Sequence, residues 1–322
     1  MLLCVTIDTE EDNWGDFNTD TYQCTNIQKI PELQRVFDKY NIIPTYLISY
    51  PVANDPISAN ILKDIAQKRR CEIGMHCHPW NTPPVEEKRN KCNSMLCNLP
   101  KELVYKKMSF LHETIKKNFG LIASSFRAGR WGYGDSVAAA LNQLNYQVDS
   151  SVFPMTDWSK DYGPDFSNIG PTPYRFHSTS IYENNKNGKM TEIPATVGFL
   201  HQNISLCVKI DKFLNHHFLR KIKMRGILRK LRIFKKIYLS PETSSFQDMI
   251  KISNYFLKKD VGILNLFFHS TSLKKGLSPF VRSEKQEIIF LKNLEKYFQY
   301  TKSIGARSAG LSQASMLLFK YV

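Results

Sequence analysis

The chain has 322 residues, of which 42% are hydrophobic and 23% charged, so it is long enough to bury a large core and is unlike a disordered polypeptide. Glycine and proline number 15 each, which excludes a collagen-like or low-complexity chain. Lysine and arginine exceed aspartate and glutamate by 44 to 29, and this net charge of +15 predicts an anionic partner.

The seven cysteines are odd in number and lack the paired spacing of a zinc knuckle, which is typical of a reduced, intracellular protein. The apolar residues 1–7 have no basic region before them and run directly into an acidic segment, so we expect no signal peptide. No run approaches the ~20 apolar residues that a transmembrane helix needs. We therefore expect a cytoplasmic protein, with peripheral attachment to the inner face of the membrane as the alternative.

Short apolar runs alternate with helical patterns along the chain. The expected strands are 2–7, 44–48, 71–75, 123–126, 146–148 and 263–268. The expected helices are 26–40, 58–68, 103–119, 135–144 and 288–300. This alternation predicts parallel strands joined by right-handed crossovers, and hence an α/β fold.

Polar side chains that could take part in catalysis or metal binding follow the ends of five expected strands. They are Asp8, His76, Arg127, Asp149 and His269. In a parallel barrel such positions gather at one rim, where active sites lie. A single histidine or aspartate at a strand end is more often structural, and it is the joint placement that favours a functional site.

The segments 8–12 and 76–78 offer ligands for a metal ion. His76 and His78 are two residues apart on an expected strand, so both rings point to the same face. Together with a carboxylate they form a set suited to zinc or another divalent transition metal. The acidic run at 8–12 can supply that carboxylate or a general base, and a solvated acidic loop is the alternative.

The segment 125–134 brings two arginines, three glycines and the aromatic residues Trp131 and Tyr133 to a strand end. It lacks the Lys-Ser/Thr ending and the glycine spacing of a phosphate loop. Its glycines allow a backbone to approach a ligand closely, and its aromatic residues favour a binding role over a plain surface turn.

These segments resemble the NodB-homology polysaccharide deacetylases, carbohydrate esterase family four, and more closely their WalW-like branch, which is linked to bacterial surface-polysaccharide loci. The resemblance is carried by residues 6–14, 46–51, 76–84, 125–132, 149–152, 163–166 and 267–279. It implies one catalytic domain over 1–322, a distorted (β/α)7 barrel with a basic helical insertion at about 210–240. It also implies an enzyme that removes an N-acyl group, usually acetyl, from an amino-sugar glycan.

The resemblance also implies catalytic roles, position by position. Asp8 would be the base, and Arg127 would hold it ionised and oriented. His269 would be the acid that protonates the departing amine, with Asp149 holding its imidazolium.

Metal and substrate contacts follow in the same way. Glu10 would bind one divalent metal beside His76 and His78; Zn²⁺ is the expected ion, with Co²⁺, Ni²⁺ or Mn²⁺ as alternatives. The residues assigned to substrate binding are Trp80, Arg130 and Trp131.

The chain departs from the family pattern in three motifs. Thr9 stands where most members have a second Asp, so the metal ligand is Glu10, Glu11 or Asp12. The two histidines are two apart rather than four, and Ala-Gly-Arg-Trp follows Arg127 in place of Pro-Tyr. These changes leave three functions open: a deacetylase, a deformylase acting on a lipid-linked sugar, and an inactive sugar-binding relative.

Residues 212–239 contain ten lysines and arginines and no acid. Apolar residues recur among them at roughly helical spacing, which predicts a basic amphipathic helix. It either packs on the barrel or lies on an anionic membrane surface, where each basic residue contributes about 1 kcal/mol. The chain has no recognised nucleic-acid-binding motif, so we expect no nucleic-acid partner.

Overall fold

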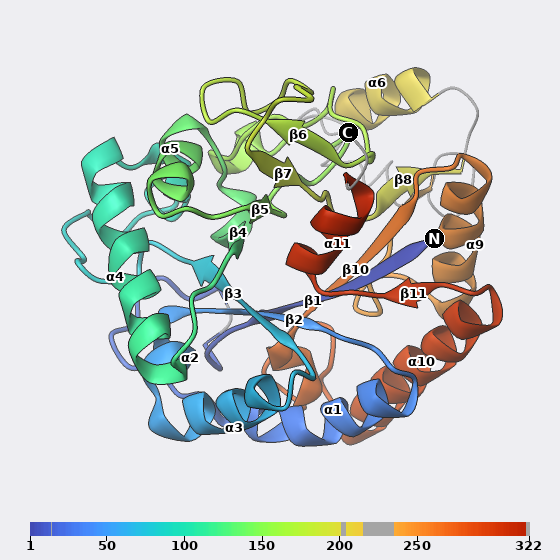
Figure 1. Ribbon diagram of the computed structural model, residues 1–322, viewed down its shortest axis with the longest axis horizontal. Helices are drawn as coiled ribbons and strands as arrows, with labels where there is room; N and C mark the ends of the chain where they lie inside the picture. Colours follow the sequence, from blue (N-terminus) through green and yellow to red (C-terminus); the bar gives the residue numbers. More distant parts are fainter. Residues whose placement is uncertain (14, 201–203, 215–234, 320–322) are drawn as a thin grey trace.

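A curled, mainly parallel sheet forms the centre of the molecule (Figure 1). The computed structural model describes residues 1–13, 15–200, 204–214 and 235–319. Within them the strand order is β10-β1-β2-β3-β4-β5-β7-β6, with β11 beside β1. The strands are β1 (Leu2–Thr9), β2 (Thr45–Ile48), β3 (Glu72–Cys77), β4 (Ser125–Ala128), β5 (Val148–Asp149), β6 (Tyr174–Phe176), β7 (Met190–Glu192), β10 (Ile263–His269) and β11 (Arg307–Ser308). A separate antiparallel pair joins β8 (Val197–Phe199) to β9 (Lys236–Tyr238).

Most of the helices surround the outside of the sheet. They are α1 (Ile30–Lys39), α2 (Tyr50–Asn54), α3 (Pro56–Gln67), α4 (Lys101–Phe119), α5 (Asp135–Gln143), α6 (Ile204–Leu214), α9 (Phe246–Lys258), α10 (Glu284–Ser303) and α11 (Leu311–Leu318). In Figure 1 the helices from α4 through α3 and α1 to α10 and α9 follow one another as an arc around the strands, whereas α11 lies inside that arc. None of the helices in the described ranges is both long enough and apolar enough to span a bilayer.

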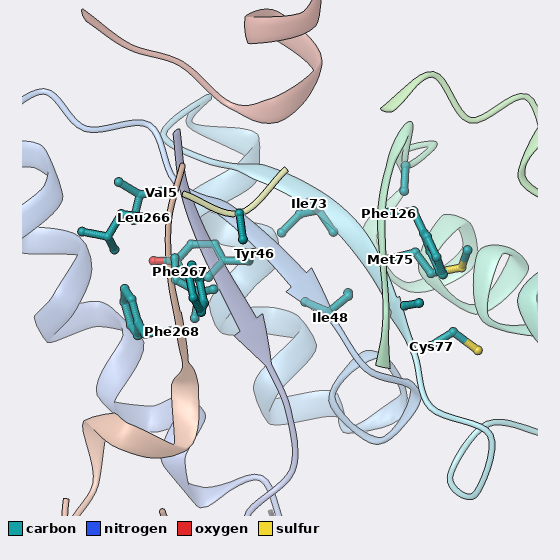
Figure 2. Packing of buried hydrophobic residues seen from close by; sticks show 14 of the residues in the cluster. Val5, Tyr46, Ile48, Ile73, Met75, Cys77, Phe126, Leu266, Phe267 and Phe268 are labelled. Carbon is teal, nitrogen blue, oxygen red and sulfur yellow. The ribbon is translucent and has the colours of Figure 1, made fainter. Parts of the chain in front are cut away.

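Side chains alternate along each strand, so that one set packs in an apolar layer under the helices and the other set faces the barrel interior. On β1, Leu3, Val5 and Ile7 are buried in the large cluster under the helices. Figure 2 shows side chains of this cluster, among them Val5, Tyr46 and Met75, around β1, β2 and β3. The alternate positions of β1 therefore face the barrel interior, and they end at Asp8.

Helix α11 closes the interior at the amino ends of the strands. Leu311 and Ala314 pack in a second cluster with inward-facing residues that include Cys4, Leu47 and Val148. The backbone N–H of Leu311 also donates a hydrogen bond to Thr45 Oγ1, at 3.0 Å. With the amino end filled in this way, the carboxyl ends of the strands are left to carry a site.

The barrel is completed by loop contacts rather than by a regular ladder between β10 and β7. Thr196 N donates to Asn265 O at 3.1 Å, and Phe267 N donates to Leu239 O at 3.1 Å. The buried Asn265 side chain crosses the same seam, with Nδ2 donating to Ser150 Oγ at 3.0 Å and to Ile193 O at 3.2 Å. The barrel is therefore distorted at this seam, as the predicted fold class requires.

The predicted α/β fold with a distorted barrel is confirmed, with differences in detail. Each expected strand and helix is present within a few residues, but β3 and β4 extend further and include His76 and Arg127 themselves. The helix predicted over the basic segment 212–239 is wrong at its end, because Lys236–Tyr238 is strand β9. Residues 215–234 of that segment lie outside the described residues.

Candidate active site

The carboxyl ends of β1, β3 and β4 bring three predicted residues to the same rim. Asp8, His76 and Arg127 all occupy inward-facing strand positions, and all are buried. In the strand register β1 pairs with β10, so that Asp8 lies opposite His269. Residues more than 250 positions apart are thus neighbours because their strands are adjacent and parallel.

The fully buried guanidinium of Arg127 donates four hydrogen bonds. Nη1 donates to Asp8 Oδ1 at 2.7 Å, Nη2 donates to Thr6 Oγ1 at 2.8 Å and to Ser150 Oγ at 2.9 Å, and Nε donates to Ser150 O at 2.9 Å. Burial alone would raise the pKa of Asp8, but the Arg127 charge, aided by His76 and His269, lowers it below the ordinary value. Arg127 therefore keeps Asp8 ionised and fixed in orientation.

Glu10 lies between the two histidines. Its Oε1 atom is 2.8 Å from His76 Nε2 and 3.0 Å from His78 Nε2. His76 Nδ1 is 2.9 Å from the backbone carbonyl of Arg127, to which it must donate, so in the neutral ring Nε2 carries a lone pair that faces Glu10. Burial would raise the pKa of Glu10, but the two histidines, His78 first, hold it well below the ordinary value.

This arrangement fits a divalent cation. A carboxylate oxygen cannot donate a hydrogen bond to the lone pair of His76 Nε2, so the contact needs a cation or a proton between its two atoms. Two imidazole nitrogens and one carboxylate oxygen, all buried and within 4.8 Å of one another, are the donor set of a zinc site with open positions. Asp8, Glu10 and His269 form a second such group on the same rim.

Of the three acids that the sequence left open as the metal ligand, Glu10 is the one that faces the histidines. Glu11 accepts hydrogen bonds from Ser49 Oγ at 3.0 Å and Asn81 Nδ2 at 2.8 Å. Asp12 accepts from the backbone N–H groups of Thr25 and Asn26, both at 3.0 Å, at the start of a 3-10 turn. The Glu11 and Asp12 carboxylates therefore stabilise the loop and do not face the group formed by Glu10, His76 and His78.

His269 is held by a residue that the sequence analysis did not select. Its Nδ1 is 3.0 Å from Glu242 Oε2, and its backbone N–H donates to Glu242 Oε1 at 3.1 Å. Its Nε2 faces Asp8 Oδ2 at 3.9 Å. Burial would lower the pKa of His269, but Glu242, then Glu10 and Asp8, raise it to about 10, so the ring is a cation at neutral pH.

The role predicted for Asp149, holding the His269 imidazolium, is corrected by this geometry. Val148 and Ser150 point into the barrel, so Asp149, between them, points to the outer face of the sheet. There it accepts a hydrogen bond from Ser151 Oγ at 2.5 Å and lies beside its register partner Glu192. Glu242 occupies the place beside His269 instead.

One feature of the sequence could have identified Glu242 as a site residue. Glu242 comes three residues after the short apolar run 237–239, in the sequence Ser-Pro-Glu-Thr, as an acid just beyond a strand end. Because this run was included in an expected basic helix, the strand and its end were missed.

A cavity of about 570 Å³ opens beside these groups. Asp8, Glu10 and His269 line it, together with eight phenylalanine, tryptophan and tyrosine side chains. The three residues predicted to bind substrate all line this cavity: Trp80, Arg130 and Trp131. The ring centroid of Trp80 lies 4.2 Å from that of His78, and the Trp131 ring lies 5.0 Å from the Arg127 guanidinium carbon. The cavity therefore places a sugar-sized space directly against the polar rim.

Gly129 lies where the chain passes over the His78 ring, and this position leaves no room for a side chain. A Cβ atom at this position would overlap the His78 ring and approach the backbone oxygen of Cys77 to 2.8 Å. The turn after β4 can therefore cover His78 only because residue 129 has no side chain.

The fold was compared with known proteins. No family model matches the sequence, and no curated protein matches it. A Mycobacterium smegmatis structure, provisionally assigned as a polysaccharide deacetylase, is 13% identical, with a TM-score of 0.54 over 99% of this chain and 91% of its own. A Parabacteroides distasonis structure, provisionally assigned as a glycoside hydrolase or deacetylase, is 11% identical, with a TM-score of 0.65 over 100% of this chain and 71% of its own.

The chain has the fold of these proteins. A 4-alpha-glucanotransferase from Thermococcus litoralis shares it too, at 12% identity and a TM-score of 0.55, over 97% of this chain and 40% of the transferase. A transferase and provisionally assigned deacetylases share the fold, so the fold alone does not determine which reaction is catalysed. The residues of the site must decide it.

Proposed function

We propose that this protein is a metal-dependent carbohydrate deacetylase of the NodB-homology type. Its substrate is an amino sugar carrying an N-acyl group, acetyl in the first instance, in a surface-polysaccharide or lipid-linked glycan precursor. The observation that carries the proposal is the position of the Asp8 carboxylate: its Oδ2 lies 3.9 Å from His269 Nε2, directly beside the Glu10–His76–His78 group. The fold shared with two provisionally assigned deacetylases supports it.

The metal would be held by Glu10, His76 and His78. When bound, a divalent ion such as Zn²⁺ supplies a Lewis acid that polarises an amide carbonyl and lowers the pKa of water. The buried walls around the three ligands, each no more than 5% exposed, keep bulk water away from the ion.

Asp8 is the base in this proposal. A carboxylate that Arg127 holds ionised can accept a proton from the attacking water through Oδ2, because Oδ1 is occupied by the guanidinium. The fixed orientation of Asp8 means that no side-chain reorganisation is needed when the proton moves.

His269 is the acid. Glu242 accepts the Nδ1 hydrogen, so Nε2–H faces Asp8 and the cavity, where the amine leaves. An amine departs from a tetrahedral intermediate only when its nitrogen is protonated, and the cationic ring can supply that proton. Glu242 stabilises the positive ring before the proton is given up.

Release of the acyl group from defined substrates tests this function. Zinc-loaded protein is incubated with N-acetylated and N-formylated amino sugars, and acetate or formate is measured separately. We expect release by the wild type and a loss of about 10²-fold to 10⁴-fold in Asp8→Asn and His269→Ala. Removal of the metal by a chelator should abolish release, and added zinc should restore it.

One control variant and two possible outcomes make the test decisive. Lys39→Gln, which removes an exposed charge paired with Glu295, should leave the rate unchanged. Rates that are equal in the wild type, Asp8→Asn and His269→Ala would contradict the assigned roles. Formate released in preference to acetate would keep the mechanism and change the acyl group.

A further inference from the structure

The turn that follows β4 holds two side chains in a costly backbone conformation. Arg130 has φ 54° and ψ 23°, and Trp131 has φ 62°, so two successive residues with side chains occupy the left-handed region. This region is unfavourable for any residue that carries a side chain. Strain of this kind persists where the surrounding structure imposes it, and it is concentrated at functional sites. Here it directs both side chains into the cavity beside the metal group.

Arg130 forms no ion pair in the described part of the chain, although the Asp161 charge acts on it from a greater distance. Its Nη1 donates to the hydroxyl of Ser94, a neutral group. The carboxylate of Asp161, which also lines the cavity, is paired with Lys91 Nζ at 2.6 Å. Arg127, three residues earlier, differs because Asp8 neutralises it.

A half-buried guanidinium without a counter-ion is unfavourable in such a place. The cavity that Arg130 lines also contains the apolar side chains of Met95, Trp131 and Trp158, and Arg130 itself is partly buried. Removing a charge from water is unfavourable unless an opposite charge compensates it. A planar guanidinium matches the two oxygens of a carboxylate or a phosphate.

We propose that the substrate carries an anionic oxygen group, a carboxylate or a phosphate, in addition to the N-acyl group, and that Arg130 binds this anion. The inference rests on the proposed function, because it concerns the same cavity. The Lys91–Asp161 pair contributes little net charge, so Arg130 supplies the positive charge in this part of the cavity. The aromatic walls bind the sugar ring, and Arg130 makes the site selective for acidic sugars or sugar phosphates.

Direct binding measurements test the proposal independently of turnover. Three ligands of similar size are titrated calorimetrically into the zinc-loaded protein at low salt: methyl N-acetylglucosaminide, N-acetylglucosaminuronic acid and N-acetylglucosamine 1-phosphate. We expect at least one anionic ligand to bind 10-fold or more tightly than the neutral one. The uronic acid and the phosphate distinguish the two sources of the anion.

The variants assign the preference to Arg130. Arg130→Gln should remove the advantage of the anionic ligand while changing the Kd of the neutral ligand by less than about 2-fold. Arg130→Lys should retain part of it, since it keeps the charge but loses the planar fork. Arg89→Gln is the matched control, because Arg89 is paired with Asp20 and does not line the cavity.

The outcomes separate this inference from the proposed function. Equal binding of neutral and anionic ligands, no binding of either anion, or a preference that survives in Arg130→Gln would overturn the role of Arg130. A preference that depends on Arg130, together with no hydrolysis of any ligand, would support the anion site and contradict the deacetylase. Repeating the titrations with Asp8→Asn should give the same preference, since Asp8 acts on the acyl group.

Discussion

At the scale of single residues, the bond between His269 Nδ1 and Glu242 Oε2 decides which nitrogen of the ring can act on a substrate. It leaves Nε2–H facing the cavity and stabilises the charged ring. Glu242 also accepts from the backbone N–H of His269, so it fixes the position of the ring as well as its charge.

Replacement of this carboxylate by an amide separates its charge from its shape. Glu242→Gln can still accept the Nδ1 hydrogen but no longer stabilises the imidazolium, so we expect kcat to fall about 10²-fold with KM nearly unchanged. Steady-state kinetics on the best substrate measures both constants. Glu284→Gln, an exposed acid paired with Lys275, is the control. An unchanged kcat in Glu242→Gln would show that Glu242 does not support the acid.

Gly129 makes a second prediction at this scale, because its missing side chain leaves room for the His78 ring. A methyl group in Gly129→Ala must displace that ring or the turn, so we expect zinc affinity to fall by about 10-fold to 100-fold. Competition with a chelating dye measures the affinity. Gly170→Ala, where a Cβ meets nothing within 4 Å, should bind zinc like the wild type. Equal affinities for the two variants would contradict the close packing of His78.

The sequence was sufficient to select the inward-facing residues of the rim but not every partner. Asp8 and His76 were selected because they lie at or just beyond strand ends, and Glu10 was selected through the family resemblance; the structure brings all three to one rim. Asp149 also lies at a strand end, but β5 has only two residues and its alternation could not be derived from so short a run. Glu242 follows a strand that the basic composition of its segment concealed.

At the scale of elements, α4 anchors the loop that follows β3, the strand that carries His76. Lys107 of α4 is fully buried, and its ammonium donates to the backbone oxygens of Pro79, Thr82 and Pro84 at 2.9, 2.9 and 2.7 Å. It also pairs with Glu87 at 2.9 Å. One side chain thus fixes the chain immediately after His78.

Loss of this ammonium should destabilise the protein strongly. Lys107→Met leaves the Glu87 carboxylate and three carbonyls buried without their partner, so we expect a loss of about 3 kcal/mol or more in the free energy of unfolding. Lys106→Met is the matched control, since Lys106 forms an exposed pair with Glu86 at 3.4 Å, and about 0.5 kcal/mol or less is expected there. Urea denaturation compares the two. Similar losses would show that the buried ammonium does not anchor the loop.

The regular elements were predictable because their periodicity is set by burial on one face. The strands of the β1 to β4 group and the helices α1, α3 and α4 are amphipathic or apolar enough to be recognised locally. Helix α11 was missed, since its role is to fill the end of the barrel through contacts with Thr45 and Glu72, which are distant in sequence. The seam at Asn265 likewise depends on contacts that no local pattern contains.

At the scale of the whole molecule, the register of β5 and β7 buries two acids against each other. Asp149 and Glu192 are register partners, and both are fully buried. Asp149 Oδ2 and Glu192 Oε2 have no other partner among the described residues, so a proton shared between them satisfies both. Burial, and then the Asp149 charge, raise the pKa of Glu192 well above its ordinary value.

This pair makes the global stability depend on pH. An acid whose pKa is higher in the folded than in the unfolded chain binds a proton on folding, so its stabilising contribution is complete below the unfolded value, about 4.3 for Glu, and is lost as the pH rises through the folded value. Glu192→Gln mimics the protonated acid at every pH. We therefore expect the variant to gain about 1–3 kcal/mol relative to the wild type on going from pH 5 to pH 8.

Urea denaturation of both proteins at pH 5 and pH 8 measures this gain. The difference between the two proteins is needed because other buried acids with raised pKa values, Glu11 and Glu72, give the wild type its own pH dependence. Glu295→Gln, an acid paired with Lys39 at the surface, should follow the wild type at both pH values. A gain of zero in Glu192→Gln would mean that both carboxylates are ionised in the folded protein, contrary to their burial side by side.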